Sequence, residues 1–198
     1  QLKKLNNLEI IENPQIAEKT APGLFYPPPS SSLVKPPPFK FNFGISSSYL
    51  SNLYFLDGET CQIIKYPALA KSKWGAPQKW IKDDSHCFEP KSMAIDGSVW
   101  ILNKDNSISR YYIGSYKETI NLDIFPVPKD ITKIKTATDI PYLYFLEPER
   151  KRIIITDKKG KIIKQFQSEK FDNLKDFAFS KDGKIIYLLN GISVYQIN

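Results

Sequence analysis

The sequence predicts an all-β fold built from repeated small sheets. Four short apolar runs, each followed by Asp, Asn or Glu, occupy residues 53–57, 99–103, 143–147 and 186–190. Their third residues are Phe55, Ile101, Phe145 and Leu188, so successive copies lie 46, 44 and 43 positions apart. Further β-prone runs and turn residues surround each copy. A period in the low-to-middle forties with several strands per repeat is typical of a β-propeller with four-stranded antiparallel blades.

Length and composition limit the alternatives. The chain has 198 residues and a formal net charge of +7, which fits one domain or at most two. It has 41% apolar and 25% charged residues, as in ordinary globular proteins, and no apolar run is long enough to span a membrane. Two cysteines without a CxxC pair and a single histidine argue against a disulfide scaffold or a structural zinc site. We therefore expect no cofactor.

Residues 1–40 are predicted to form an extended, proline-rich leader. Eight of the fifteen prolines lie in the first 42 residues, and proline has no N–H to donate inside a sheet. Ahead of them, residues 5–11 contain an apolar run that could form one strand. Because the last repeat lacks an outer strand, we expect this run to pair with it and close the ring. The chain begins at Gln1, so we also expect it to be part of a longer polypeptide.

The propeller is predicted over residues 41–198, with repeats at about 41–84, 85–128, 129–170 and 171–198. In the first repeat, the expected strands are 40–45, 53–56, 62–66 and 78–81. In the second repeat, they are 92–95, 99–102 and 108–113.

The third repeat contains all four expected strands, at 131–137, 142–146, 152–156 and 161–166. The fourth offers 175–179, 184–189 and 192–197. Asp182-Gly183 and Asn190-Gly191 separate these last three, since both dipeptides tolerate the positive φ of tight hairpin turns. The second strand of each repeat is apolar at nearly every position, which indicates a strand covered on both faces by the neighbouring blades.

The third repeat resembles the NHL-type propeller repeat. Residues 144–147, 152–157 and 159–166 follow that family's order of an aromatic-aliphatic strand ending in an acid, an Arg-Ile strand, an Asp-x-x-Gly turn and an outer strand ending in Phe. The resemblance implies a binding or sensor module, often attached to a membrane protein or an enzyme. We therefore expect a non-catalytic scaffold with a protein partner. Its location stays open, with the extracytoplasmic or soluble part of a membrane-anchored bacterial protein as one option.

Two groups are candidate partner-binding residues. Trp74 and Trp80 lie in a long connection, where exposed aromatic side chains would suit peptide or sugar stacking; packing against the neighbouring blade is the competing interpretation. Arg150, Lys151 and Arg152 form a basic turn. The basic surplus of residues 131–198 is interleaved with Asp and Glu, which indicates a solvated surface, so no nucleic-acid partner is expected. Self-association is expected if the ring is incomplete.

The alternative function is a metal-dependent hydrolase. In a ring, Asp57, Asn103, Glu147 and Asn190 would lie at one level, and a propeller sugar-lactone hydrolase holds a divalent ion with comparable oxygens. The favoured interpretation is that each side chain caps the turn after its strand.

The sequence leaves two further points open. Asp83, Asp84, His86 and Cys87 are four potential metal ligands within five residues. No chelating spacing recurs, so a polar loop is the favoured interpretation. Whether Cys61 and Cys87 pair cannot be decided from their positions.

Overall fold

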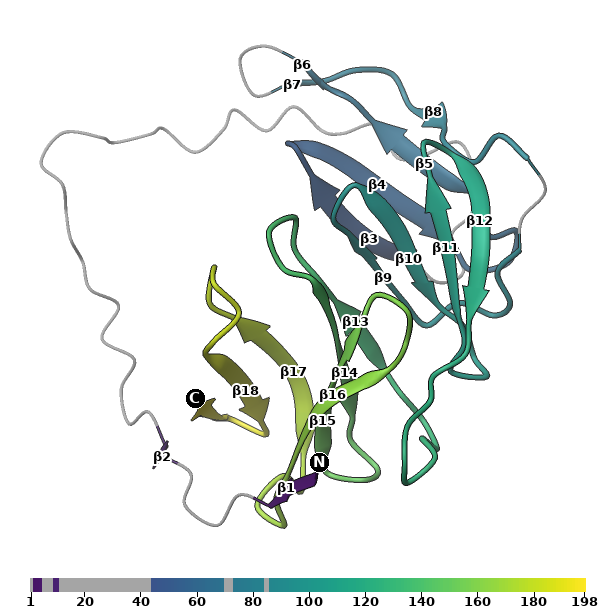
Figure 1. The fold of residues 1–198 in the computed structure, drawn as a ribbon. Helices are drawn as coiled ribbons and strands as arrows, with labels where there is room; N and C mark the ends of the chain where they lie inside the picture. The colour runs from purple at the N-terminus through teal and green to yellow at the C-terminus, as the bar shows by residue number, and fades with distance from the viewer. Residues whose placement is uncertain (1, 5–8, 11–43, 70–72, 84–85) are drawn as a thin grey trace, which may run out of the picture.

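The computed structural model describes residues 2–4, 9–10, 44–69, 73–83 and 86–198, and their regular structure is entirely β-strand (Figure 1). The strands form four small sheets and one two-stranded hairpin. The fold is an all-β, four-bladed propeller, as the repeat predicts. None of the described residues forms a helix long and apolar enough to cross a membrane.

Hydrogen bonds join the strands of each sheet in a definite order. The order in the first sheet is β3 (Gly44–Tyr49), β4 (Asn52–Asp57), β5 (Ile63–Tyr66) and β8 (Gln78–Lys79). In the second sheet it is β12 (Ser115–Ile120), β11 (Ile108–Tyr112), β10 (Ser98–Leu102) and β9 (Ser92–Ile95).

The order in the third sheet is β1 (Leu2–Lys4), β16 (Ile162–Gln167), β15 (Arg152–Asp157), β14 (Tyr142–Glu147) and β13 (Lys133–Lys135). In the fourth sheet it is β17 (Leu174–Phe179), β18 (Ile186–Asn190), β19 (Ser193–Ile197) and β2 (Glu9–Ile10). The separate hairpin consists of β6 (Ala68–Leu69) and β7 (Lys73–Trp74).

The N-terminal residues complete sheets made by the end of the chain. Strand β2 pairs antiparallel with β19, with Ile10 opposite Tyr195, and so supplies the outer strand that the fourth repeat lacks. This is the closing strand predicted within residues 5–11. Strand β1 pairs parallel with β16, an addition that the sequence pattern does not predict. The proline-rich stretch of the leader lies outside the described residues.

In each of the first two sheets, one strand differs from the prediction. The innermost strand of the first sheet is β3 rather than 40–45, because it lines a central cavity and needs no apolar run: Ser46 pairs with Phe55 and Ser48 with Leu53. The second sheet also has the outer strand β12, which the pattern misses. Its three central residues are exposed and polar, so its sequence carries little of the apolar signal expected for a strand.

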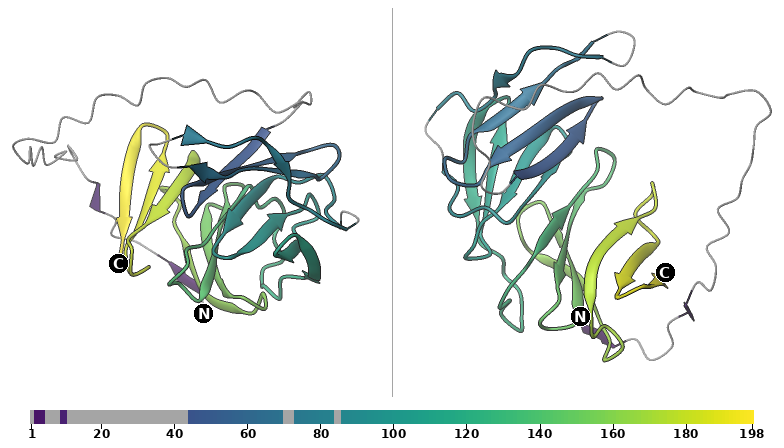
Figure 2. Two further views of the ribbon diagram at one scale, coloured as in Figure 1. Left: turned by 90° about the horizontal axis from the view of Figure 1, so that it is seen from above. Right: turned by 180° about the vertical axis from the view of Figure 1, so that it is seen from behind.

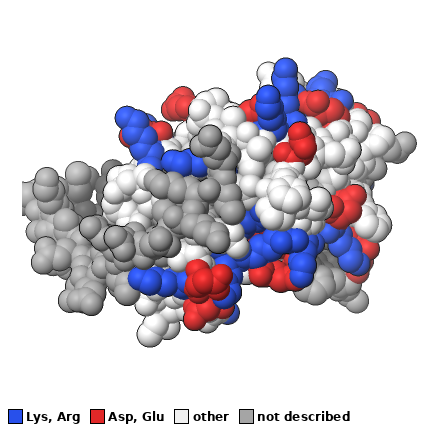
Figure 3. All heavy atoms as spheres, turned by 60° about the horizontal axis from the view of Figure 1, so that its bottom comes forward, with Lys and Arg blue, Asp and Glu red and all other residues white. Residues whose placement is uncertain are grey.

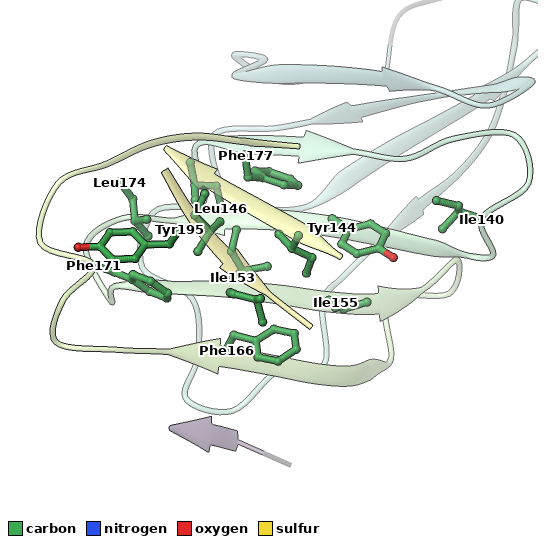
Figure 4. Packing of buried hydrophobic residues seen from close by; sticks show 13 residues of the cluster. Ile140, Tyr144, Leu146, Ile153, Ile155, Phe166, Phe171, Leu174, Phe177 and Tyr195 are labelled. Atoms are coloured by element: carbon green, nitrogen blue, oxygen red, sulfur yellow. The ribbon is translucent and has the colours of Figure 1, made fainter. Parts of the chain in front are cut away.

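Three hydrophobic cores hold the blades together, each between two consecutive sheets. Tyr54, Leu56 and Ile101 belong to the core between the first and second sheets, and Phe145 packs with Trp100 between the second and third. The core between the third and fourth sheets includes Tyr144, Ile153, Phe166, Phe177 and Tyr195 (Figure 4). Among the described residues, no comparable core joins the fourth sheet to the first.

Burial of the second strands follows from this arrangement. Every residue of β10 is buried, as is every residue of β14 except Tyr142. In β4 and β18, buried residues are interspersed with partly exposed ones. Coverage on both faces is therefore confirmed for the two middle blades and wrong for the two end blades. The views in Figure 2 show the end blades flanking the others around a common centre.

Truncation of a central core residue measures this packing. Phe145 is fully buried between two blades. Phe145→Ala is expected to lower the free energy of unfolding by about 3–5 kcal/mol, because it removes a whole ring from a packed interface. Phe125→Ala is the matched control, since Phe125 is exposed, and should change it by less than about 0.5 kcal/mol. Urea unfolding measures both, and equal effects would contradict the proposed packing.

Candidate binding site

The four polar residues at the ends of the second strands, Asp57, Asn103, Glu147 and Asn190, bond to the backbone. Three of them each accept an N–H from the segment leading into their own sheet. These bonds are Phe88 N to Asn103 Oδ1 at 3.0 Å, Lys129 N to Glu147 Oε1 at 2.7 Å and Asn173 N to Asn190 Oδ1 at 2.8 Å. Asp57 Oδ1 instead accepts the N–H of Glu59 in its own turn, at 2.8 Å. These four side chains therefore fix connections at the ends of the blades.

The central cavity is lined by other residues. It has a volume of about 590 Å³, and all four inner strands contribute to it, including Ser46, Ser48, Lys133 and Lys135. Asp57, Asn103, Glu147 and Asn190 are not among its lining residues. Within the described ranges, no three His, Cys, Asp or Glu side chains converge as metal ligands would. The four side chains named for the metal-dependent hydrolase hypothesis thus bond to the backbone and do not line the central cavity.

A buried ion pair lies at one end of the third sheet. Glu147 ends β14 and Arg152 begins β15, so the hairpin register places them directly opposite each other. Arg152 Nε donates to Glu147 Oε2 at 2.5 Å, and the exposed fractions of the two side chains are 1% and 0%. Arg152 Nη1 also donates to Gln165 Oε1 on β16. A charged pair without solvent needs such additional partners, because desolvation costs several kcal/mol per ion.

The same buried side chains hold the segment between β12 and β13, residues 121–132, which we call the connecting loop. Arg152 Nη2 donates to Pro126 O at 2.7 Å, and Gln165 Nε2 donates to Phe125 O at 2.8 Å. Together with the bond from Lys129 N to Glu147, three backbone groups of the connecting loop end on buried side chains of the third sheet. The loop is therefore fixed from inside the blade.

The connecting loop exposes two large apolar side chains. Phe125 is 84% exposed and Val127 is 71% exposed, whereas Ile124 and Ile131 on either side of them are buried. Apolar residues anchor both ends, and the segment between them projects outward. Exposed apolar side chains on a well-ordered loop are typical of contact residues for a partner.

The basic turn predicted from the sequence lies beside this loop. A 2.5 Å ion pair between Lys129 and Glu149 joins the turn to the loop. Arg150 Nε lies 3.5 Å from Glu147 Oε1, and Lys151 pairs with Glu169 at 2.6 Å. Arg152 differs from its two neighbours because it is buried, so its contacts are internal ones.

The other residues singled out from the sequence lie outside the connecting loop and the basic turn. Trp80 packs edge-on against Tyr54, with ring centroids 6.2 Å apart, beside the core between the first two sheets. Trp74 on β7 is 37% exposed, and its indole N–H donates to Ser51 O at 3.1 Å. Cys61 and Cys87 form a disulfide with Cα atoms 6.0 Å apart, which settles the pairing left open by the sequence. The ring of His86 stacks on Tyr116.

Basic and acidic side chains are interspersed on the surface shown in Figure 3. Arg110 and Glu118 form an ion pair at 2.7 Å, and Lys135 and Asp176 form one at 2.8 Å. Such mixed charge is typical of a solvated surface.

Comparison with known proteins supports the fold. No family model matches the chain, and no curated protein matches it in sequence. A gluconolactonase from Xanthomonas campestris matches 73% of this chain and 52% of its own, at 9% identity and a TM-score of 0.53. A catalytically inactive virginiamycin B lyase from Staphylococcus aureus, solved with quinupristin, matches 73% of this chain and 47% of its own, at 18% identity and a TM-score of 0.50.

A hydrazine synthase from Kuenenia stuttgartiensis matches 70% of this chain and 38% of its own, at 15% identity and a TM-score of 0.49. The chain thus spans at most about half the length of these three structures. The gluconolactonase and the lyase are β-propellers, and at these identities the similarity concerns the fold alone. The narrower NHL-type assignment is not confirmed.

Sequence reasoning missed Phe125, Val127 and Gln165. Phe125-Pro126-Val127 is an apolar tripeptide between two predicted repeats, a weak signal by itself. The stronger signal was the pairing of Glu147 with Arg152 across a predicted hairpin, because a buried pair there must bond neighbouring backbone groups. Only the structure shows that these backbone groups belong to the connecting loop, where Pro126 lies 26 residues before Arg152.

Removing one partner of the buried pair tests its structural role. Arg152→Met is expected to lower the free energy of unfolding by about 3–5 kcal/mol, because Glu147 would stay buried without its counter-ion. Lys151→Ala, which breaks an exposed pair in the same turn, should cost less than about 1 kcal/mol. Urea denaturation measures both variants. The double variant Glu147→Leu/Arg152→Met should recover part of the loss, and a harmless Arg152→Met would show that the pair is not structural.

Proposed function

We propose that this chain is a non-catalytic binding module that docks a protein partner through Phe125 and Val127 of the connecting loop. The observation that carries the proposal is the combination of high exposure with a backbone held by buried side chains. A loop with only one of these properties would be an ordinary surface segment.

The energetics favour this site for binding. Burying a Val or Phe side chain contributes about 1.5–3 kcal/mol each, so the two together can act as the anchor of an interface. A loop that is already ordered loses little conformational entropy when a partner binds, and this preorganisation raises affinity. The bonds to Pro126 O, Phe125 O and Lys129 N supply that order.

The surroundings indicate the partner's chemistry. Lys129 and Glu149 form an exposed ion pair next to the apolar residues, and Lys151 pairs with Glu169 in the adjacent turn. An apolar centre with a charged rim is the usual composition of a protein–protein interface. The partner should therefore offer apolar side chains bordered by polar groups.

Selection of peptides on the immobilised protein tests the proposal without a known partner. Peptides displayed on phage and selected on the wild-type chain should be rich in apolar and aromatic residues. The variant Phe125→Ser/Val127→Ser should bind the selected peptides at least about tenfold more weakly, because both anchors are lost. Fluorescence anisotropy with labelled peptides measures the affinities.

Controls separate this site from general surface stickiness. Ile163→Ser/Ile192→Ser removes two other exposed apolar side chains, which are 46% and 102% exposed, and should leave the affinity unchanged. Trp74→Ala in the same assay measures the contribution of the exposed tryptophan predicted from the sequence. Equal binding by the wild-type chain and the Phe125→Ser/Val127→Ser variant would overturn the proposal.

A further inference from the structure

A second concave site lies at the junction of the second and third sheets, and its lining does not include Phe125 or Val127. Its volume is about 720 Å³. Asp96, Ser98 and Arg110 of the second sheet and the turn residues Lys158 and Lys159 of the third contribute to its wall. This volume lies within the range of about 300–1,000 Å³ common for small-molecule sites.

The turn of the third sheet fits tightly against the second sheet. Gly160, at a φ of +82°, sits where an added Cβ would lie 2.7 Å from Ile120 Cγ2 and 3.0 Å from Asn121 O. Asp123 N also donates to Gly160 O at 3.3 Å. The glycine therefore lets the turn approach closely, which places Lys158 and Lys159 over the second sheet.

Two cations share one buried indole in this pocket. Arg110 Cζ lies 5.3 Å and Lys158 Nζ lies 5.2 Å from the centroid of the Trp100 ring. Asp96 Oδ1 accepts the Trp100 indole N–H at 2.8 Å and so fixes the ring. The electrostatic attraction of the ring for cations stabilises both contacts. The pKa of Lys158 is lower than usual, because burial disfavours the charged form. The hydrogen bond and charge of Asp96 oppose this shift, and the charge of Arg110 adds to it.

Arg110 and Lys158 each pair with one carboxylate of the pocket, and Lys159 adds a third basic group to its lining. Asp96 also accepts the Ser98 N–H and the Trp100 indole N–H besides its 2.5 Å contact with Lys158. Glu118 pairs with Arg110 Nη1 at 2.7 Å but is half exposed. Three basic residues, counting Lys159, line the pocket with two acidic ones. No described residue accepts a hydrogen bond from Arg110 Nη2, which leaves a donor for a ligand.

We propose that this pocket binds an oxyanion, a carboxylate or phosphate group carried by a molecule of about monosaccharide size. Arg110 and Lys158 hold the anionic group through charge-assisted hydrogen bonds. Tyr112, which lines the same pocket and is 46% exposed, offers a ring face to the rest of the ligand. A pocket this large leaves room for more than the anionic group itself.

Isothermal titration calorimetry with four probes tests the site. Glucose 6-phosphate and glucuronate should bind, inorganic phosphate should bind more weakly, and glucose should not bind. The ratio of the first two affinities shows whether phosphate or carboxylate is the preferred group. Binding should also shift the Trp100 indole N–H signal in an NMR spectrum, because that group bonds to Asp96 beside Lys158.

Two charge-matched variants keep the test specific. Arg110→Gln should raise the Kd of the better anionic sugar about tenfold or more, because a charge-assisted hydrogen bond is lost. Lys117→Gln removes the same charge from an exposed position on β12 and should leave the Kd unchanged. Equal losses in the two variants, equal binding of glucose, or no binding of any anion at millimolar concentration would overturn the proposal. Any of these results would mean that the charged residues of the pocket hold the second and third sheets together and bind no ligand.

Discussion

The fold depends on the fact that none of its sheets can bury its apolar faces alone. A blade of three or four short strands has apolar side chains on both faces, so each blade becomes stable only when neighbours cover it. The three cores between consecutive sheets meet this need for the middle blades. In the end blades, β4 and β18 keep partly exposed residues, because the described chain provides no fourth core. Pairing of β2 with β19 ties the N-terminal residues to the last blade.

Within this stack, the buried pair of Glu147 and Arg152 links packing to the candidate binding site. The hairpin register places the two residues opposite each other, and each also bonds to the backbone of the connecting loop between the second and third sheets. The desolvation cost of the pair is offset only when those bonds form, so the loop and the ion pair stabilise each other. The pocket proposed to bind an oxyanion also depends on a contact between blades, since Lys158 of the third sheet pairs with Asp96 of the second.

The sequence predicts the repeat because second strands such as 99–102 and 143–146 are apolar and regularly spaced. It also predicts the closing strand, because one end lacks a strand and the other has one to spare. The pattern predicts strand β3 too early in the chain, at 40–45. Its serines line the central cavity, so it lacks the apolar run by which a strand is recognised. Phe125 and Val127 could not be predicted as a site, because their presentation depends on Arg152 and Gln165, which are distant in sequence. Likewise, the pocket around Trp100 depends on contacts between separate blades.

The proposed binding depends on a connecting loop that buried side chains of the third sheet hold rigid while Phe125 and Val127 stay exposed. Backbone 15N relaxation at Val127 and Lys129 measures this most directly. Order parameters near about 0.85, equal to those of the neighbouring strands, are the predicted result. Values below about 0.6 at these two amides in the wild-type chain would show a flexible loop and contradict the claim.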